Sequence, residues 1–144
     1  MINRKYFSIN NKKDIEKLME EYSYFHDSCI IKISYESGAY VNEDLSMNLI
    51  NDKRILKVVF QRQENPRNLE IKFNKLIKLN LAPESEDYDC IILGATMEIK
   101  DGNIYWINEE NVPIDRIDNY MHYTWVIAKE GEYSIYQSNR FRGG

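Results

Sequence analysis

The sequence has few residues of the kinds that form covalent or redox sites. Only two cysteines, Cys29 and Cys90, occur among the 144 residues. Two thiols cannot build a disulfide framework, and their wide separation excludes a Cys-x-x-Cys motif. Because each cysteine lies in an apolar run, we expect both to be buried free thiols in a reducing compartment.

Long apolar segments are also missing. The longest apolar run lies near residues 90–97 and is well short of the roughly 20 residues that a membrane-spanning helix needs. The N-terminal stretch MINRKYFSINNKK contains no apolar core of a secretory signal. We therefore expect a cytoplasmic protein without a membrane partner.

A net positive charge and a glycine-rich segment are missing as well. The net charge is −4 and the pI is about 5.3, which disfavours nucleic-acid binding because that binding needs a positive surface. The six glycines form no glycine-rich phosphate loop, and residues 87–101 do not match a calcium-binding EF-hand loop. These features predict no nucleic-acid partner, no cofactor and no metal site.

One amphipathic helix is clearly predicted. Within residues 12–25, apolar side chains recur three and four positions apart, which places them on one helical face. The residues of this stripe are Ile15, Leu18, Met19, Tyr22 and Phe25. Asn10 or Asn11 can cap the helix start by accepting a hydrogen bond from a free backbone N–H.

After Asp27 the apolar spacing changes to two residues, which predicts β-strands. The predicted strands are 29–35, 45–49, 56–60, 69–73, 90–99, 104–107, 121–127 and 133–136, and 76–81 is either a further strand or an extension of 69–73 past a bulge. In the first strand, alternation predicts a shared buried face for Cys29, Ile31, Ile33 and Tyr35.

Turn residues connect these strands. Asp101-Gly102-Asn103 predicts a tight hairpin, because glycine and asparagine tolerate the positive φ that such turns require. Glu130-Gly131 predicts another turn. Short turns favour antiparallel neighbours, since a parallel crossover needs a dozen or more residues.

The predicted fold is therefore α+β and mainly β. One N-terminal helix packs on a curled antiparallel sheet of about eight strands, and the sheet could close partly into a barrel, which would remove exposed edges. The length of 144 residues suits one domain over residues 1–144. We expect residues 138–144 to be a flexible tail.

The stretch YFHDSCII carries a histidine, an acid, a hydroxyl and a thiol side by side. One interpretation makes His26, with Asp27, the base of a hydrolase. The structural interpretation is that Asp27 or Ser28 accepts hydrogen bonds from free backbone N–H groups, while His26 covers the helix C-terminus. A metal set of His26, His122 and an acid is conceivable, but nothing in the spacing requires it.

Two groups of residues are candidates for binding. The acidic group is Glu84, Glu86, Asp87 and Asp89, whose charge would speed encounter with a basic partner. The aromatic group comes from the C-terminal forty residues and includes Tyr105, Tyr123, Tyr133 and Tyr136. Tyrosines at alternate strand positions build cores, line ligand cavities or form contact surfaces.

The motif YFHDS at a strand start, with a short helix before it and a meander of strands after it, resembles small uncharacterised bacterial proteins of the immunity type. The resemblance implies a protein that neutralises a toxin by binding it. Our first hypothesis is therefore a non-catalytic cytoplasmic binding protein that holds a protein partner through an acidic, Tyr-rich surface. The alternative is a small-ligand-binding β-barrel with an aromatic-lined cavity, and the hydrolase ranks last.

Overall fold

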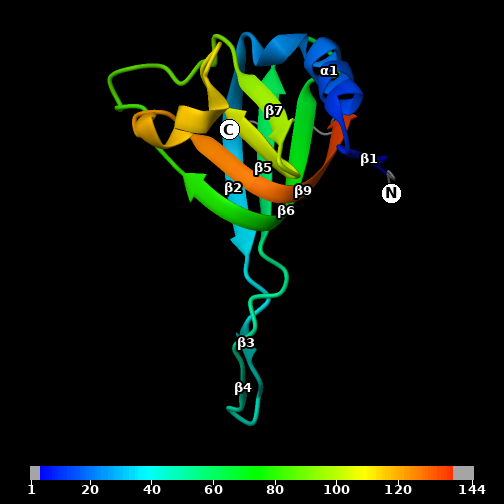
Figure 1. The fold of residues 1–144 in the computed structure, drawn as a ribbon, viewed down its shortest axis with the longest axis vertical. Helices are drawn as coiled ribbons and strands as arrows, with labels where there is room; N and C mark the ends of the chain where they lie inside the picture. The colour runs from blue at the N-terminus through cyan, green and yellow to red at the C-terminus, as the bar shows by residue number, and fades with distance from the viewer. Residues whose placement is uncertain (1–3, 138–144) are drawn as a thin grey trace.

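The structure is a computed structural model, and it describes residues 4–137. One α-helix, α1 (Lys12–Glu21), stands beside a large antiparallel sheet (Figure 1). The strands are β1 (Phe7–Ser8), β2 (Ser28–Glu36), β3 (Tyr40–Val41), β4 (Met47–Asn48), β5 (Ile55–Arg62), β6 (Asn68–Asn80), β7 (Thr96–Lys100), β8 (Asn103–Ile107) and β9 (Trp125–Tyr136). Two 3-10 segments are η1 (Ser23–Phe25) and η2 (Ile114–Asn119). The α+β, mainly β prediction is confirmed, and the predicted tail 138–144 lies outside the described residues.

The main sheet has the strand order β2-β5-β6-β9-β8-β7, and β1 pairs with the far end of β9. All of these pairs are antiparallel, as the short turns predict. The sheet curls strongly but does not close (Figure 1). An isolated bridge between Ser28 and Ile92 joins β2 to the segment that precedes β7.

Two turn and bulge predictions are confirmed. Asp101 and Gly102 have φ values of 51° and 80° and connect β7 to β8 as a two-residue hairpin. Residues 76–81 extend the preceding strand: β6 continues to Asn80 past an irregularity between Leu76 and Lys78. The chain bends there, which allows β6 and β9 to curve together.

The predicted turn at Glu130-Gly131 is wrong, because β9 runs without a break through both residues. Gly131 pairs with Phe73 of β6. The carbonyl of Gly131 also accepts a hydrogen bond from the N–H of Ile9, in the N-terminal segment, at 2.9 Å. A side chain at Gly131 would meet Ile104 Cδ1 at 3.1 Å. Glycine therefore permits close packing here and does not reverse the chain.

The predicted buried face of β2 is also wrong in part. The register with β5 shifts between Ile30 and Lys32, and Ile31 is 50% exposed, as is Tyr35 at 51%. A one-residue bulge moves the residues beyond it to the other face of a strand, which alternation alone cannot reveal. Ile33 packs on the core as predicted, and Ile30 packs there although alternation placed it on the other face.

The cysteines differ from the prediction as well. Cys29 is half-buried and Cys90 is exposed. Segment 90–99, predicted as one long strand, contributes β7 and the single bridge at Ile92, and the rest is loop. The apolar run around Cys90 therefore lies largely on the surface, so the expectation of two buried thiols fails for Cys90.

Helix α1 starts where predicted but ends earlier, at Glu21 instead of Phe25. Asn11 caps it by accepting from the backbone N–H of Asp14 at 3.0 Å. Ser23, Tyr24 and Phe25 all have positive φ, between 52° and 64°. Left-handed backbone costs roughly 1–2 kcal/mol per residue, and it directs the Phe25 ring into the core.

The core lies on the inner face of the curled sheet. Phe25, Phe60 and Trp106 meet edge to face, with ring centroids 5.0 to 5.6 Å apart, and all three are fully buried. On the opposite face of the sheet, η2 covers a smaller cluster that contains Ile107, Val112, Ile117 and Trp125. Large side chains thus fill both faces around β8 and β9.

Replacing Phe25 with alanine should lower the free energy of unfolding by about 3–5 kcal/mol, because the cavity would open at the centre of the aromatic cluster. Tyr24→Ala is the matched control: Tyr24 has the same left-handed backbone but a largely exposed ring, and we expect a change of about 0.5 kcal/mol. Urea unfolding followed by tryptophan fluorescence measures both. Equal losses in the two variants would contradict this account of the core.

Candidate functional site

A hairpin between β2 and β5 projects away from the rest of the molecule (Figure 1). We call residues 37–54 the arm. Its strands β3 and β4 pair with each other, with Tyr40 opposite Asn48 and Val41 opposite Met47. Every residue from 39 to 53 is exposed except the half-buried Asn48. The arm therefore contributes almost nothing to the core.

The arm exposes large apolar side chains. Their exposed fractions lie between 56% and 79%, and they are Tyr40, Val41, Leu45, Met47, Leu49 and Ile50. An isolated two-stranded hairpin is marginally stable in water, and apolar groups left in water add nothing to folding. A group of exposed apolar side chains of this size on one projecting element is typical of an interaction surface.

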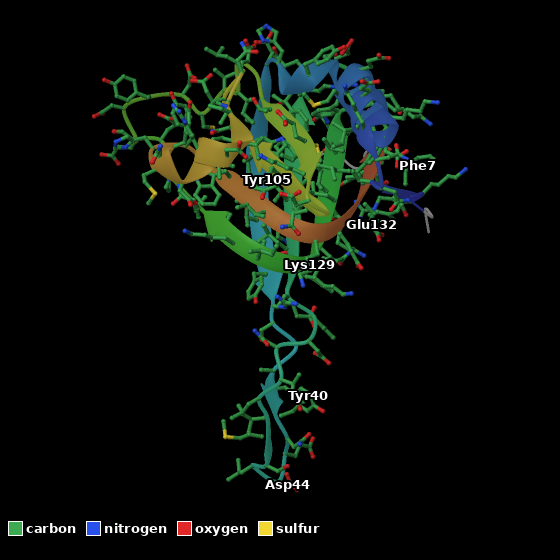
Figure 2. The ribbon with its side chains drawn as sticks, in the orientation of Figure 1. Phe7, Tyr40, Asp44, Tyr105, Lys129 and Glu132 are labelled. Carbon is green, nitrogen blue, oxygen red and sulfur yellow. The ribbon has the colours of Figure 1, made fainter. Side chains whose placement is uncertain are left out.

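The tip of the arm is held by its own hydrogen bonds. The N–H of Asn42 donates to the carbonyl of Ser46 at 2.8 Å, and the N–H of Leu45 donates to the carbonyl of Asn42 at 2.8 Å. Both the N–H and the hydroxyl of Ser46 donate to the carboxylate of Asp44, which lowers the pKa of Asp44. Leu45 has φ of 72° and is the most exposed apolar residue of the arm. Figure 2 shows Asp44 at the far end of the arm and Tyr40 nearer to the body.

The base of the arm is fixed to the sheet. The carbonyl of Ser37 accepts from the N–H groups of Lys53 and Arg54 at 3.0 and 3.1 Å. Arg54 in turn exchanges two hydrogen bonds with Leu76 at the bulge of β6. Gly38 has φ of 103°, and a side chain there would lie 2.3 Å from Asp52 Oδ1. Glycine is needed at this position, and the direction of the arm is set by these contacts.

Charge on the projecting part of the arm has one sign, whereas its base carries Lys53 and Arg54. Residues 39–52 contain the acids Glu43, Asp44 and Asp52 and no lysine or arginine. The projecting part of the arm is thus apolar and acidic, which suits an apolar recess with basic groups around it. Sequence analysis predicted a strand at 45–49 but missed the arm, because apolar alternation looks the same in a core strand and in a projecting hairpin.

The predicted acidic residues lie together on the loop between β6 and β7. All four carboxylates, Glu84, Glu86, Asp87 and Asp89, are exposed. The loop is fastened near its start, where Ala82 donates its N–H to Thr124 Oγ1 at 3.0 Å. We call residues 84–89 the acidic loop. Tyr88 within it is also exposed.

The predicted tyrosines do not form one surface. Tyr105 and Tyr123 are half-buried against the Trp125 cluster, and the pKa of Tyr123 is raised mainly by a hydrogen bond to Glu109 and the charge of that carboxylate, with a smaller effect from the charge of Glu84. Tyr136 lies near the other end of β9, where the Arg4 guanidinium is 4.3 Å from its ring centre.

Tyr133 is part of the core and cannot contribute to a surface. It is 2% exposed, and its hydroxyl lies 3.5 Å from Glu21 Oε1. Burial and the nearby Glu21 raise the pKa of Tyr133 to about 12. The alternation of β9 places its side chain inward, toward α1, because the strand is not interrupted at Gly131.

The stretch YFHDS acts as a clasp between two segments. His26 Nδ1 lies 2.7 Å from the carbonyl of Leu93. The N–H of Asp27 donates to Ile92 at 2.8 Å, and the N–H of Ile92 donates to Ser28 at 2.7 Å. These bonds fasten the start of β2 to the segment before β7, which leaves the two edges of the curled sheet joined at one point.

The clasp differs in detail from the structural interpretation of the sequence. Ser28 is buried and donates its hydroxyl proton to the carbonyl of Phe25 at 2.6 Å, instead of accepting from a backbone N–H. His26 contacts Leu93 and Asp27 and does not cover the end of α1. His122 is exposed, and residues 4–137 contain no group of three or more histidine, cysteine or acidic side chains that could hold a metal ion.

Comparison of the chain with protein-family models, with curated proteins and with solved structures gives no match. The immunity-type resemblance therefore stays a prediction. Among residues 4–137, no helix has both the length and the apolar composition needed to cross a lipid bilayer. The candidate site rests on geometry alone, and the arm is its most conspicuous element.

Shortening the arm should leave the body intact. Replacing residues 40–50 with a short glycine-serine turn should change the free energy of unfolding by less than about 1 kcal/mol, because these side chains bury little and loop length has a weak effect on closure. Urea unfolding of the two proteins makes the comparison. A loss of more than about 2 kcal/mol would show that the arm is a structural part of the fold.

His26 should titrate above its ordinary pKa of 6.5, because the Leu93 carbonyl and then the Asp27 charge favour the imidazolium form. A raised folded-state pKa means that protonated His26 stabilises the fold below pH 6.5, and that this contribution disappears as the pH rises through the folded-state value. An NMR pH titration of the imidazole measures the pKa, and Asp27→Asn should lower it. A pKa at or below 6.5 in the wild type would contradict the clasp.

Proposed function

We propose that this protein is a non-catalytic binding protein that holds a protein partner, with the arm as its main contact. The observation that carries the proposal is the ordered arm, which exposes six large apolar side chains yet is fixed at its base and tip. A segment that exposes this much apolar surface and still keeps one direction is organised before any partner arrives. Such preorganisation reduces the cost of binding.

The partner should offer an apolar recess with a basic rim. Leu45 and Leu49 are the most exposed apolar side chains of the arm and serve as anchors, because a few buried side chains carry most of the binding energy at an interface. The acids of the arm and the overall charge of −4 favour encounter with a positively charged surface.

The acidic loop is the second part of this proposal. Its four carboxylates are exposed, and Tyr88, Ile91 and Leu93 provide exposed apolar surface beside them. This combination supports an acidic, aromatic contact, although the tyrosine involved is Tyr88 and not the four predicted ones. Rim charges of this kind act mainly on the association rate.

The resemblance of YFHDS and its helix-then-meander context to immunity-type proteins suggests the identity of the partner class. We propose a toxin in the bacterial cytoplasm, held in an inactive complex. A basic toxin surface would meet both the charge and the apolar requirements of the arm.

The other two hypotheses gain no support from the geometry. Phe25, Phe60 and Trp106 fill the inner face of the curled sheet, where a barrel ligand would have to bind. His26 and Asp27 are exposed and 3.4 Å apart, and the other imidazole nitrogen is engaged by the Leu93 carbonyl. His26 thus has a structural contact in the clasp, and its geometry adds no support to the hydrolase hypothesis.

Capture of the partner from native cells by the tagged protein tests the arm. The double variant Leu45→Ser with Leu49→Ser should reduce the captured amount at least tenfold, as expected when anchors worth about 2 kcal/mol or more are lost. The matched control is Ile77→Ser with Met121→Ser, which removes two exposed apolar side chains from outside the arm and the acidic loop. Equal capture by both double variants and the wild type would show that the arm does not contribute to binding of the partner.

Neutralising the acidic loop separates its role from that of the arm. The variant carries Glu84→Gln, Glu86→Gln, Asp87→Asn and Asp89→Asn. We expect slower association and a weaker salt dependence, with a nearly unchanged dissociation rate, because exposed charges steer encounter more than they hold a complex. Surface plasmon resonance with the identified partner measures both rates. An unchanged association rate would exclude the loop from the encounter.

A further inference from the structure

A groove lies between residues of α1 and β7. Both elements are at the end of the body away from the arm (Figure 1). Its volume is about 870 Å³, and its apolar lining includes Ile15, Met19, Tyr24, Met97 and Ile99. A second cavity of about 400 Å³ shares Met19, Tyr24 and Met97 with it and continues toward Val112. The two form one elongated depression, which we call the groove.

Strand β7 offers an open edge to this depression. Among residues 4–137 it is the last strand in the sheet order, so only its β8 side is paired. Lys100 and Asn103 flank the two-residue turn and form a hydrogen-bonded pair, and such pairs alternate along an antiparallel hairpin. The N–H and C=O groups of Met97 and Ile99 therefore point to the unpaired side, where a further strand could bond to them.

Natural proteins protect open edges with charge, bulges or coverage. Here the unpaired side of β7 borders a depression, and the side chains of Met97 and Ile99 pack toward the core. The left-handed backbone at Ser23 to Phe25 holds Tyr24 over both parts of the groove, with its ring 56% exposed. Strand, helix and aromatic ring together border the groove.

The charges around the groove select its occupant. The exposed acids that line it are Glu16, Glu20, Glu98 and Glu110, and Lys12 is the one cation among the lining residues of its two parts. An apolar floor with an acidic rim fits a segment whose side chains alternate between apolar and basic. The arm of a second copy is acidic and is disfavoured by like charge.

We propose that the groove binds an extended basic segment of a protein partner, which pairs with β7 as an additional strand. The apolar side chains of the segment face Met19 and Met97, and its lysines or arginines face Glu16 and Glu98. This mode is strand addition at a sheet edge, in which main-chain bonds give affinity and alternate side chains give specificity. The site is separate from the arm, and the test of this proposal does not depend on whether the arm binds a partner.

The probe is a fluorescein-labelled nonapeptide that alternates valine and lysine, followed by fluorescence anisotropy with the full-length protein. The matched peptide alternates valine and glutamate and should not bind. Two further peptides carry N-methyl groups on either the valine or the lysine amides. Because successive amides of a strand point to opposite sides, one methylated peptide should lose binding and the other should keep it. Equal binding of both methylated peptides and the parent would overturn strand addition.

Charge reversal places the probe in the groove. The variant Glu16→Lys with Glu98→Lys should weaken binding about tenfold, which corresponds to the loss of two exposed charge pairs and their replacement by repulsion. The control, Glu84→Lys with Glu86→Lys, makes the same change in net charge on the acidic loop and should bind as the wild type does. Equal weakening in both variants would show that only overall charge attracts the peptide, which contradicts the proposal.

The same assay separates this site from the arm. The variant Leu45→Ser with Leu49→Ser should bind the peptide with unchanged affinity, since the arm projects from the opposite end of the body to α1 (Figure 1). Loss of peptide binding in that variant would assign the peptide to the arm and overturn the groove as its site.

Discussion

The antiparallel ladder between β6 and β9 supports every other element of the structure. It extends from Asn68 opposite Tyr136 to Asn80 opposite Trp125, with one irregularity near Leu76. On the β6 side it carries β5 and β2, and therefore the arm; on the β9 side it carries β8 and β7, and therefore the groove. Because the two long strands bend together, the outer strands turn toward each other and the aromatic core lies between them.

A curled but open sheet must manage its two ends. The clasp of His26, Asp27 and Ser28 joins the start of β2 to Ile92 and Leu93. This contact explains why a chemically reactive-looking stretch has a structural role: its polar groups bond to backbone groups that a closed ladder would otherwise pair. The left-handed residues just before it have a cost in backbone energy, and burial of Phe25 offsets that cost.

The sequence predicted those elements in which one residue type controls the local backbone. Asp101-Gly102 is such a case, because its positive φ values define a hairpin. The strands at 56–60 and 69–73 were also predictable, since their apolar residues alternate regularly. β5 keeps this alternation of burial, whereas both faces of β6 are buried over residues 68–71. Alternation failed at Ile31, where a bulge shifts the register, and at Gly131, where glycine serves packing within a strand.

The arm and the groove were harder to predict, because each depends on which other segments of the chain pack against it in space. Leu45 to Leu49 alternate as a core strand would, and only the three-dimensional structure shows that no other part of residues 4–137 covers them. The groove arises from the distance between α1 and β7, which are far apart in the sequence. The acidic loop, in contrast, was visible from composition, since four acids within six residues rarely occupy a buried position.

The relative positions of the arm and the groove limit how a partner could use both. The arm extends from one end of the body, and α1 with its groove lies toward the other (Figure 1). A compact partner centred on the arm would reach the groove only through an extended segment, which is the form that strand addition at β7 requires. Two contacts joined by such a segment would reinforce each other through effective concentration, without any change of shape in this protein. Both proposed contacts would select for positive charge, so the two proposals together describe a basic partner with one folded face and one extended tail.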